Sequence, residues 1–480
     1  MLAKPAKKIE VLLVASESAP FAHVGGLGDI IQGLAGALWK QNISVSLILP
    51  KYEQIKSGEL VTGKIPVNLG SSTEYIRLYR DTLPKTETKV WLVENKEYLS
   101  TGPIYFSRTA LSGSLGELQR FVFFSKAVAE LLRDGFLGNP DIVHCNDWHT
   151  GALIAELSKI KYGRPKTLFT IHNLENQGCW RASDLARWLP NLSDIAPSMK
   201  SGEINLMRDA IELADCVNTV SPSYAEEIKT TEYGVGLENT LRARGKTLTG
   251  ILNGIDYTTY NPKTDQALTA RYDQTSAEEK EKNKHALQKK LGLKTGRKHP
   301  LFGVVSRLTR QKGIDLILPN LKTMIQRYDA QIVILGTGAS EIEEAVKSAE
   351  RSFRGNVAAR IGFDDKLARL IYASCNFFLM PSRFEPCGLG QMIAMRYGTV
   401  PIVRSTGGLK DTVQNNRNGL TFDEATPEAC GNAIERAEKM FFAENDTYTT
   451  LEQQCFAENF SVERAARSYA KLYRLLVKKF

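Results

Sequence analysis

A carboxylate and two cations in the second half of the chain are the side chains best suited to chemistry. Glu385 lies in the segment Pro381 to Gly390, just beyond a short apolar run. A carboxylate there could bind sugar hydroxyls or stabilise developing positive charge. Arg307 and Lys312 follow another apolar run, where an arginine offers a rigid fork to a diphosphate and a lysine adds a compact charge. Each residue taken singly also fits an ordinary surface position.

Two glycine turns have the composition of anion sites. Gly25, Gly26 and Gly28 lie between an apolar run and a helical pattern, and Gly407, Gly408 and Leu409 follow a later run in the same way. Exposed backbone N–H groups and the positive end of a helix favour phosphates and sugar oxygens. The spacing of the first turn is neither the dinucleotide fingerprint nor a P-loop. That turn alone therefore leaves open both a binding site and a simple turn.

Polar clusters also follow two apolar runs of the first half. Asp147 and His149 come after the run at 142–143, and His172 and Asn173 come directly after Ile171. A lone histidine is more often structural than functional. The histidines and Asp147 lack the spacing typical of metal ligands, so we predict no metal site.

Alternating strands and helices must position these residues. Apolar runs separated by helical stretches predict a parallel sheet covered on both faces in each half of the chain. The predicted strands of the first half are Val11 to Ala15, Val45 to Leu49, Val90 to Val93, Ile142 to Val143, Thr167 to Ile171 and Cys216 to Val220. Those of the second half are Leu301 to Val305, Gln331 to Leu335, Ala358 to Ile361, Phe377 to Met380 and Val400 to Val403. We therefore expect two doubly wound, Rossmann-like α/β domains, with ligands beyond the carboxyl ends of the strands and a deep cleft between the halves.

The composition excludes several classes of protein. The chain has 480 residues, 42% hydrophobic and 24% charged, with a formal net charge of +9. Lysine and arginine are spread along the chain without a nucleic-acid-binding motif, so we expect no nucleic-acid partner. Seven scattered cysteines without a CxxC pair suggest free thiols. The first apolar run is too short for a signal peptide or a membrane span, so we expect a cytoplasmic enzyme, with the plastid stroma left open and the oligomeric state undetermined.

Taken together, the motifs closely resemble those of bacterial glycogen synthases and plant starch synthases, glycosyltransferase family 5. The matching strings, which extend over nearly the whole chain, include ASESAPFAHVGGLGD, HCNDWHT, TIHNLENQG, VSRLTRQKGIDL, PSRFEPCGLGQM and STGGLKDTV. The resemblance implies a two-domain glycosyltransferase-B fold. It also implies retaining transfer of glucose from ADP-glucose, less often UDP-glucose, to the non-reducing end of an α-1,4-glucan, with no cofactor or required metal.

The resemblance also implies domain roles and site residues. Residues 1–258 would form the acceptor-side domain, 259–459 the donor domain, and a helix at 460–480 would pack back on the first. The residues implied for catalysis are Glu385, His172, Arg307 and Lys312. Those implied for donor binding are His23, Gly25, Gly26, Phe363, Cys387, Gly388, Leu389, Gly407, Gly408 and Leu409. Those implied for the acceptor side are Asp29, Asp147, His149 and Asn173.

Two departures from the family pattern matter for the site. Phe363 stands where the family usually has a tyrosine over the nucleotide base, and a phenyl ring can still stack. His23 stands where the family's glycine loop begins with lysine. A histidine is not fully charged at neutral pH, so donor affinity that weakens as pH rises, or impaired catalysis, would follow. A non-catalytic glucan-binding or regulatory homologue and a different retaining transferase of the same fold are the alternatives.

Overall fold

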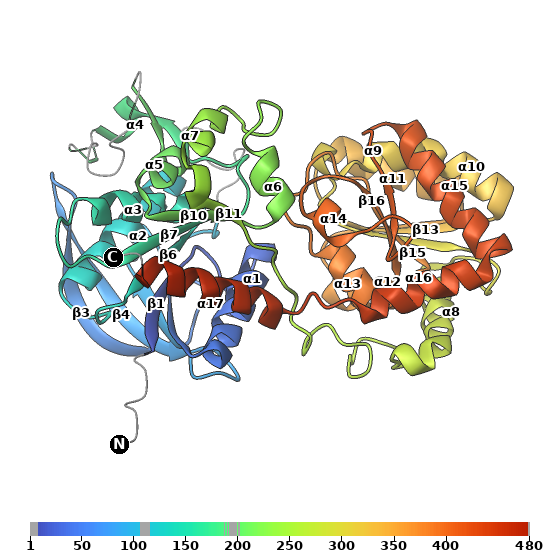
Figure 1. Cartoon of the computed structure of the whole chain (residues 1–480), viewed down its shortest axis with the longest axis horizontal. Helices are drawn as coiled ribbons and strands as arrows, with labels where there is room; N and C mark the ends of the chain where they lie inside the picture. Colours follow the sequence, from blue (N-terminus) through green and yellow to red (C-terminus); the bar gives the residue numbers. More distant parts are fainter. Residues whose placement is uncertain are drawn as a thin grey trace. The chain divides into compact units, whose positions relative to one another are not determined.

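The computed structural model divides into two compact units. It describes residues 8–105, 116–186, 188–189, 191, 199 and 202–478. Unit 1 contains Met1–Gly254 and Val462–Phe480, and unit 2 contains Ile255–Ser461 (Figure 1). The chain therefore passes from unit 1 to unit 2 and returns for its last helix.

Unit 1 is built on a nine-stranded sheet of order β11-β10-β7-β6-β1-β2-β5-β4-β3. Its strands are β1 (Ile9–Val14), β2 (Ile43–Pro50), β3 (Glu59–Asn68), β4 (Thr73–Thr82), β5 (Lys89–Glu94), β6 (Ile142–Asn146), β7 (Lys166–Ile171), β10 (Cys216–Thr219) and β11 (Leu248–Gly250). A separate hairpin pairs β8 (Cys179–Arg181) with β9 (Glu203–Asn205). All six predicted strands are present at nearly the expected residues.

The prediction of a wholly parallel sheet was wrong at one edge. Strands β3 and β4 pair antiparallel with each other, and β4 pairs antiparallel with β5. Only four residues join β3 to β4, too few for the crossover that a parallel pair needs. The alternating burial of β4 (Thr73–Thr82) also differs from the continuous apolar runs of the central strands, because one face is exposed.

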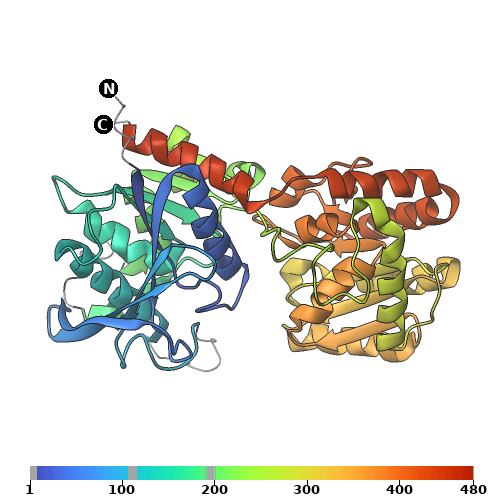
Figure 2. The same ribbon diagram turned by 90° about the horizontal axis from the view of Figure 1, so that it is seen from below.

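The helices of unit 1 cover both faces of this sheet. They are α1 (Gly26–Leu38), α2 (Gly116–Arg133), α3 (Gly151–Ser158), α4 (Ala182–Ala186), α5 (Leu206–Leu213), α6 (Pro222–Glu227), α7 (Glu238–Ala243) and α17 (Val462–Lys478). Helix α17 lies beside α1 (Figures 1 and 2), and a Cβ added at Gly33 of α1 would lie 3.1 Å from Val462 Cγ2. Its buried residues recur at helical spacing, so one apolar stripe faces the core.

A chain of buried hydrogen bonds also joins α17 to the sheet. Tyr473 Oη lies 2.8 Å from His144 Nδ1, and His144 Nε2 lies 2.6 Å from Thr170 Oγ1. Thr170 donates to Asn218 Oδ1 at 2.6 Å, and Asn218 Nδ2 donates to Tyr469 Oη at 3.0 Å. Since Thr170 donates its hydroxyl proton to Asn218, its oxygen accepts from His144 Nε2–H. Both nitrogens of His144 therefore have partners.

Unit 2 has a six-stranded, wholly parallel sheet of order β14-β13-β12-β15-β16-β17. Its strands are β12 (Leu301–Val305), β13 (Gln331–Gly336), β14 (Val357–Ile361), β15 (Phe377–Met380), β16 (Val400–Arg404) and β17 (Leu420–Phe422). Its helices are α8 (Lys280–Leu291), α9 (Ile314–Ile317), α10 (Leu321–Tyr328), α11 (Ser340–Ser352), α12 (Asp365–Ser374), α13 (Gly390–Arg396), α14 (Gly407–Thr412), α15 (Pro427–Ala443) and α16 (Asn445–Ala457). Both units are thus Rossmann-like, which confirms the predicted fold class.

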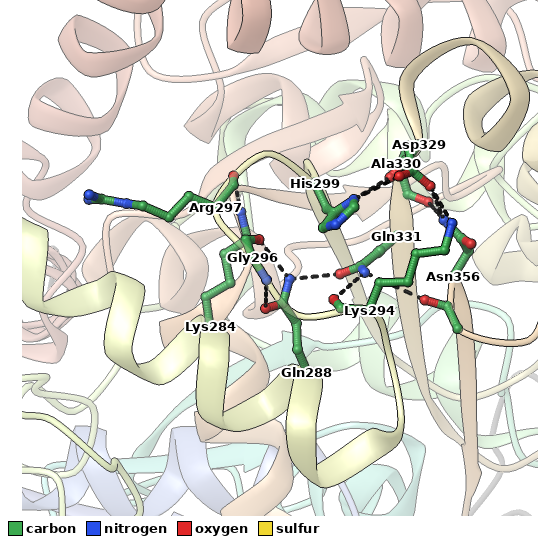
Figure 3. A network of polar contacts seen from close by, with 11 residues as sticks. Lys284, Gln288, Lys294, Gly296, Arg297, His299, Asp329, Ala330, Gln331 and Asn356 are labelled. Carbon is green, nitrogen blue, oxygen red and sulfur yellow. Dashed lines mark hydrogen bonds and ion pairs between the residues drawn. The ribbon is translucent and has the colours of Figure 1, made fainter.

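The amino end of the unit 2 sheet is closed by a polar network (Figure 3). Gln288 Nε2 donates to Gln331 Oε1 at 2.9 Å, and Gln331 Nε2 donates to the Lys294 carbonyl at 2.6 Å. Asn356 Nδ2 donates to Asp329 Oδ1 at 3.0 Å, which also accepts from Lys294 Nζ at 2.7 Å. These bonds tie the start of β13 to α8 and its following loop.

Two further findings concern the whole described chain. No helix of the described ranges is long and apolar enough to cross a membrane. All seven cysteines carry free thiols, and Cys179 is the exposed one.

Candidate functional site

The carboxyl end of the unit 2 sheet brings Lys312 and Glu385 together. Lys312 ends a short helical turn after β12, and Glu385 lies in the loop after β15. Lys312 Nζ lies 2.6 Å from Glu385 Oε2, which also accepts from Ser382 Oγ at 2.9 Å. Their side chains are only 16% and 7% exposed. An ammonium has three donors, so Lys312 can keep this contact and still donate to an anion.

Two glycines let the loops of this site approach each other closely. Gly313 has φ 69°, and a Cβ there would lie 2.1 Å from the Pro381 carbonyl oxygen. A Cβ at Gly408 would lie 2.2 Å from the Cys387 carbonyl oxygen. Any side chain at either position would push the Glu385 loop away from its neighbours.

In the second glycine turn, Gly407 to Leu409, two backbone N–H groups donate to carbonyls of the chain itself. The Gly408 N–H donates to the Glu385 carbonyl at 3.0 Å, and the Leu409 N–H donates to the Thr406 carbonyl at 3.0 Å. The N–H groups of Gly408 and Leu409, which we expected to assist with a phosphate, therefore already have acceptors in the chain. This turn supports the Glu385 loop.

Sequence reasoning missed Gln391, which supports the loop from within α13. Its buried Nε2 lies 3.1 Å from the Cys387 carbonyl, 3.0 Å from the Gly388 carbonyl and 3.1 Å from Thr412 Oγ1. Gly388 has φ 75°, a conformation that favours glycine. A polar residue in the apolar pattern of this helix was the available signal.

Arg307 and Phe363 lie at the ends of β12 and β14 with their side chains exposed. Arg307 Nη2 donates to Gln311 Oε1 at 3.0 Å, which leaves other N–H groups of the guanidinium for a ligand. The Phe363 side chain is 85% exposed. A phenyl group so exposed in water is suited to stacking on a planar partner.

In unit 1, Asp147 organises the ends of β6 and β7. Its Oδ1 accepts from the His172 N–H at 2.7 Å and from the Asn173 N–H at 3.4 Å. Its own N–H donates to the Thr170 carbonyl at 2.9 Å, and its φ is 57°. Burial raises the pKa of Asp147 to about 7, although the two N–H groups oppose that shift. Asp147 therefore acts here as a support for the His172 loop.

His172 has one ring nitrogen bonded and one without a protein partner. Its Nε2 lies 2.9 Å from Asn146 Oδ1. Asn146 Nδ2 donates to the Val14 and His144 carbonyls, so its oxygen must accept and His172 Nε2 carries the proton. Burial lowers the pKa of His172 to about 3, so the ring is neutral near pH 7. Its Nδ1 is buried and has no hydrogen-bond partner among the described residues, which suits it to accept from a ligand hydroxyl.

His149 is packed among aromatic rings. Its ring centroid lies 4.2 Å from that of Trp148 and 4.6 Å from that of Phe121. Burial lowers its pKa to about 3.

Within the described ranges, no three His, Cys, Asp or Glu side chains are placed to hold a metal ion.

The first glycine turn differs from the expected row of exposed N–H groups. The N–H groups of Val24 and Gly25 donate to Glu17 Oε2 at 2.6 and 3.1 Å, and the Gly28 N–H donates to the Gly25 carbonyl at 3.2 Å. The N–H groups of Gly25 and Gly28 therefore already have acceptors within the chain. Helix α1 begins at Gly26, and the first N–H groups of a helix have no acceptor within it. Those of Gly26 and Leu27 remain the candidates for a phosphate.

His23 is turned toward the start of the same helix. Its Nε2 lies 3.2 Å from Asp29 Oδ2, and the two side chains are 38% and 37% exposed. A Cβ at Gly28 would lie 2.9 Å from His23 Cδ2. The histidine thus packs across the glycine turn.

Comparison with known proteins decides the family. Residues 10–243 match the model of the starch synthase catalytic domain, and residues 283–447 match that of glycosyl transferases group 1. The glycogen synthase of Geotalea daltonii is 40% identical over 488 residues, covering 98% of this chain and 99% of the relative. The chain belongs to the glycogen and starch synthase family. The glycogen synthase of Moorella thermoacetica, 39% identical with 98% of both chains covered, agrees with this.

Solved structures agree with this membership. The catalytic domain of starch synthase IV from Arabidopsis thaliana, bound to ADP and acarbose, matches with a TM-score of 0.88 and 33% identity, covering 98% of this chain and all of that one. Sucrose-phosphate synthase from Thermosynechococcus elongatus, at 19% identity and a TM-score of 0.62, shares the fold. The family and the glycosyltransferase-B fold inferred from the motifs are thereby confirmed. The roles of individual residues stay predictions.

Proposed function

We propose that this chain transfers glucose from ADP-glucose to the non-reducing end of an α-1,4-glucan, with retention of configuration. The observation that carries the proposal is the Lys312–Glu385 pair at the carboxyl end of the unit 2 sheet, in a chain that matches glycogen synthases over its full length. A cation and a carboxylate held 2.6 Å apart offer one group to a phosphate and one to sugar hydroxyls.

The donor half of the reaction is assigned to unit 2. Arg307 and Lys312 would hold the diphosphate and neutralise the charge that develops on the departing ADP. Glu385 would accept hydrogen bonds from hydroxyls of the transferred glucose, while its contact with Lys312 holds the carboxylate in position. Phe363 would stack on the nucleotide base.

We favour front-face attack for the transfer step. The C4 hydroxyl oxygen of the acceptor bonds to C1 of the donor glucose as the bond from C1 to the phosphate oxygen breaks. The departing phosphate takes the proton of that hydroxyl, so ADP leaves carrying it. Retaining glycosidases use a second carboxylate as nucleophile, and the family motif places none next to Glu385. Retention is therefore assigned to same-face attack.

Unit 1 would contribute the groups that orient the sugars. His172 would accept a hydrogen bond at Nδ1 from a hydroxyl of the transferred glucose, because Nε2 is already committed to Asn146. Asp147 holds the His172 loop, and Asn173 would lie on the acceptor side with it.

One assay tests the proposal directly. The protein would be incubated with glycogen and either labelled ADP-glucose or labelled UDP-glucose, and the polymer would be counted. We expect incorporation from ADP-glucose. Incorporation from UDP-glucose alone would correct the donor, and absence of labelled polymer with both donors would overturn the proposed function.

We also propose that the transfer needs no resident metal ion. The charge of the departing diphosphate would be met by the fixed cations Arg307 and Lys312. Dialysis of the enzyme against EDTA should leave the rate of glucose incorporation unchanged, and recovery of a lost rate by added Mg²⁺ or Mn²⁺ would contradict this.

A further inference from the structure

The glycine turn of unit 1 rests on a buried carboxylate. Glu17 follows the strand β1 by three residues, and only 3% of it is exposed. Its Oε2 accepts from the Val24 N–H at 2.6 Å and from the Gly25 N–H at 3.1 Å. Two consecutive peptide groups of the turn therefore point inward to a single oxygen atom.

The other oxygen of this carboxylate is held by Tyr105. Tyr105 Oη lies 3.1 Å from Glu17 Oε1 and 2.7 Å from Ser16 Oγ. The segment before Tyr105 is fixed in turn by the buried guanidinium of Arg120, which donates to the carbonyls of Tyr98, at 2.9 Å, and Ile104, at 3.1 Å. Glu17 therefore has partners on both oxygens and little freedom to move.

The interior of the turn is filled. A Cβ at Gly28 would lie 3.3 Å from Glu17 Oε2, besides its clash with His23. Val24 itself is 61% exposed, so Glu17 holds the Val24 peptide from the inner side of the turn. The shape of the turn thus depends on the carboxylate.

We infer that Glu17 is a positioning residue, whose carboxylate fixes the Val24 and Gly25 peptides so that the Gly26 and Leu27 N–H groups at the start of α1 face a donor phosphate. This inference rests on the proposed function, which supplies the phosphate. Glu17 acts through the backbone of the turn and needs no contact with the substrate.

The positioning role of Glu17 requires the length of the glutamate side chain and does not require its negative charge. Burial raises the pKa of Glu17, while the bonds from Val24, Gly25 and Tyr105 oppose that shift. A protonated carboxyl would still accept both N–H groups at Oε2, with its proton on Oε1 toward Tyr105. A glutamine would do the same with its amide oxygen. An aspartate keeps the charge but is one methylene too short.

Three variants, Glu17→Gln, Glu17→Asp and Glu17→Ala, separate the effect of side-chain length from that of charge. The control is Glu53→Ala, which removes an exposed glutamate. The first readout is hydrogen exchange at the Val24 and Gly25 amides, which needs no activity. We expect exchange in Glu17→Gln to match the wild type, and exchange in Glu17→Asp and Glu17→Ala to be at least about tenfold faster. If Glu17→Ala does not fold, the pair Glu17→Gln and Glu17→Asp still decides.

The second readout is binding of ADP by titration calorimetry, followed by kcat and KM for ADP-glucose. We expect Glu17→Asp to bind ADP about tenfold more weakly and to raise KM more than it lowers kcat, with Glu17→Gln near the wild type. If Glu17→Asp behaves like the wild type and Glu17→Gln is impaired, the carboxylate acts through its charge and the inference is overturned. A wild type that makes no polymer would refute the proposed function. Amide exchange would still test whether Glu17 holds the Val24 and Gly25 peptides.

Discussion

Polar side chains crowd both ends of the unit 2 sheet, but they are used differently at each. At the amino end, the amides of Gln288, Gln331 and Asn356 bridge loops and strand starts through bonds that begin and end within the chain (Figure 3). At the carboxyl end, Lys312 has donors to spare beyond Glu385, and the guanidinium of Arg307 is exposed. Spare hydrogen-bonding capacity therefore marks the site, whereas the density of polar groups does not.

Two histidines of unit 1, His144 and His172, repeat this contrast. Burial lowers the pKa of both His144 and His172 to about 3. His144 uses both nitrogens, toward Tyr473 and Thr170, and so holds α17. His172 uses one and leaves the other for a ligand. A shifted pKa thus does not distinguish a structural histidine from a functional one, because burial shifts both alike.

Removal of a cation from the carboxyl end should have the largest effect. We expect Arg307→Ala and Lys312→Ala each to lower kcat with ADP-glucose by about 10²-fold or more, since each removes a donor to the departing diphosphate. Initial rates of glucose incorporation measure this, with Lys322→Ala, an exposed lysine on α10, as the control. Near-normal rates in both variants would contradict the assignment of the site.

Removal of a cation from the amino end should change stability and leave turnover intact. Lys284 is buried, donates to the Arg297 carbonyl at 3.0 Å and lies 5.2 Å from the Phe441 ring centroid. Burial lowers its pKa from 10.5 to about 8. Between these values the unfolded chain binds more protons, so this residue makes the free energy of unfolding rise with pH, by at most about 3 kcal/mol.

Denaturant unfolding at pH 7.5 and pH 10 checks this. Lys284→Met should lack the rise with pH that the wild type shows, and its kcat should equal that of the wild type. Lys289→Met, an exposed lysine on the same helix, should keep the rise. A large loss of kcat in Lys284→Met would contradict the assignment of a structural role to the amino end of the unit 2 sheet.

Phe363 tests whether exposure at the carboxyl end means contact with the donor. We expect Phe363→Ala to raise the KM for ADP-glucose about tenfold with little change in kcat, because stacking on the base stabilises substrate and transition state alike. Phe363→Tyr should keep the wild-type KM. The control is Phe442→Ala, which removes an exposed ring on α15; a KM in Phe363→Ala no higher than in this control would exclude stacking.

The smallest expected effect concerns His23, whose visible partner is Asp29. A histidine loses its charge as the pH rises past the ordinary histidine pKa of about 6.5, whereas a lysine stays charged. If His23 also contacts the donor phosphates, ADP binding should weaken from pH 6 to pH 8 in the natural chain and stay level in His23→Lys. Identical profiles, measured by titration calorimetry, would limit His23 to its contact with Asp29.

Much of the fold could be read from the sequence because apolar runs report buried strands directly. The strand Leu301–Val305 occurs at the residues expected from its run. The antiparallel strands β3 and β4 were missed, since their alternating pattern buries only one face and produces no continuous run. Helix α8 (Lys280–Leu291) consists largely of charged and polar residues, yet its Leu287 and Leu291 lie in the unit 2 core.

The candidate site divides in the same way. The sequence by itself determined the family and the residues with the right chemistry, such as Glu385 and Lys312, because a motif records residue type and spacing. Only the tertiary structure decided which of their atoms are already engaged: the N–H of Gly408 by Glu385, and those of Val24 and Gly25 by Glu17. These hydrogen bonds join different loops or different parts of one loop, and their geometry depends on how the loops pack, which local pattern does not encode.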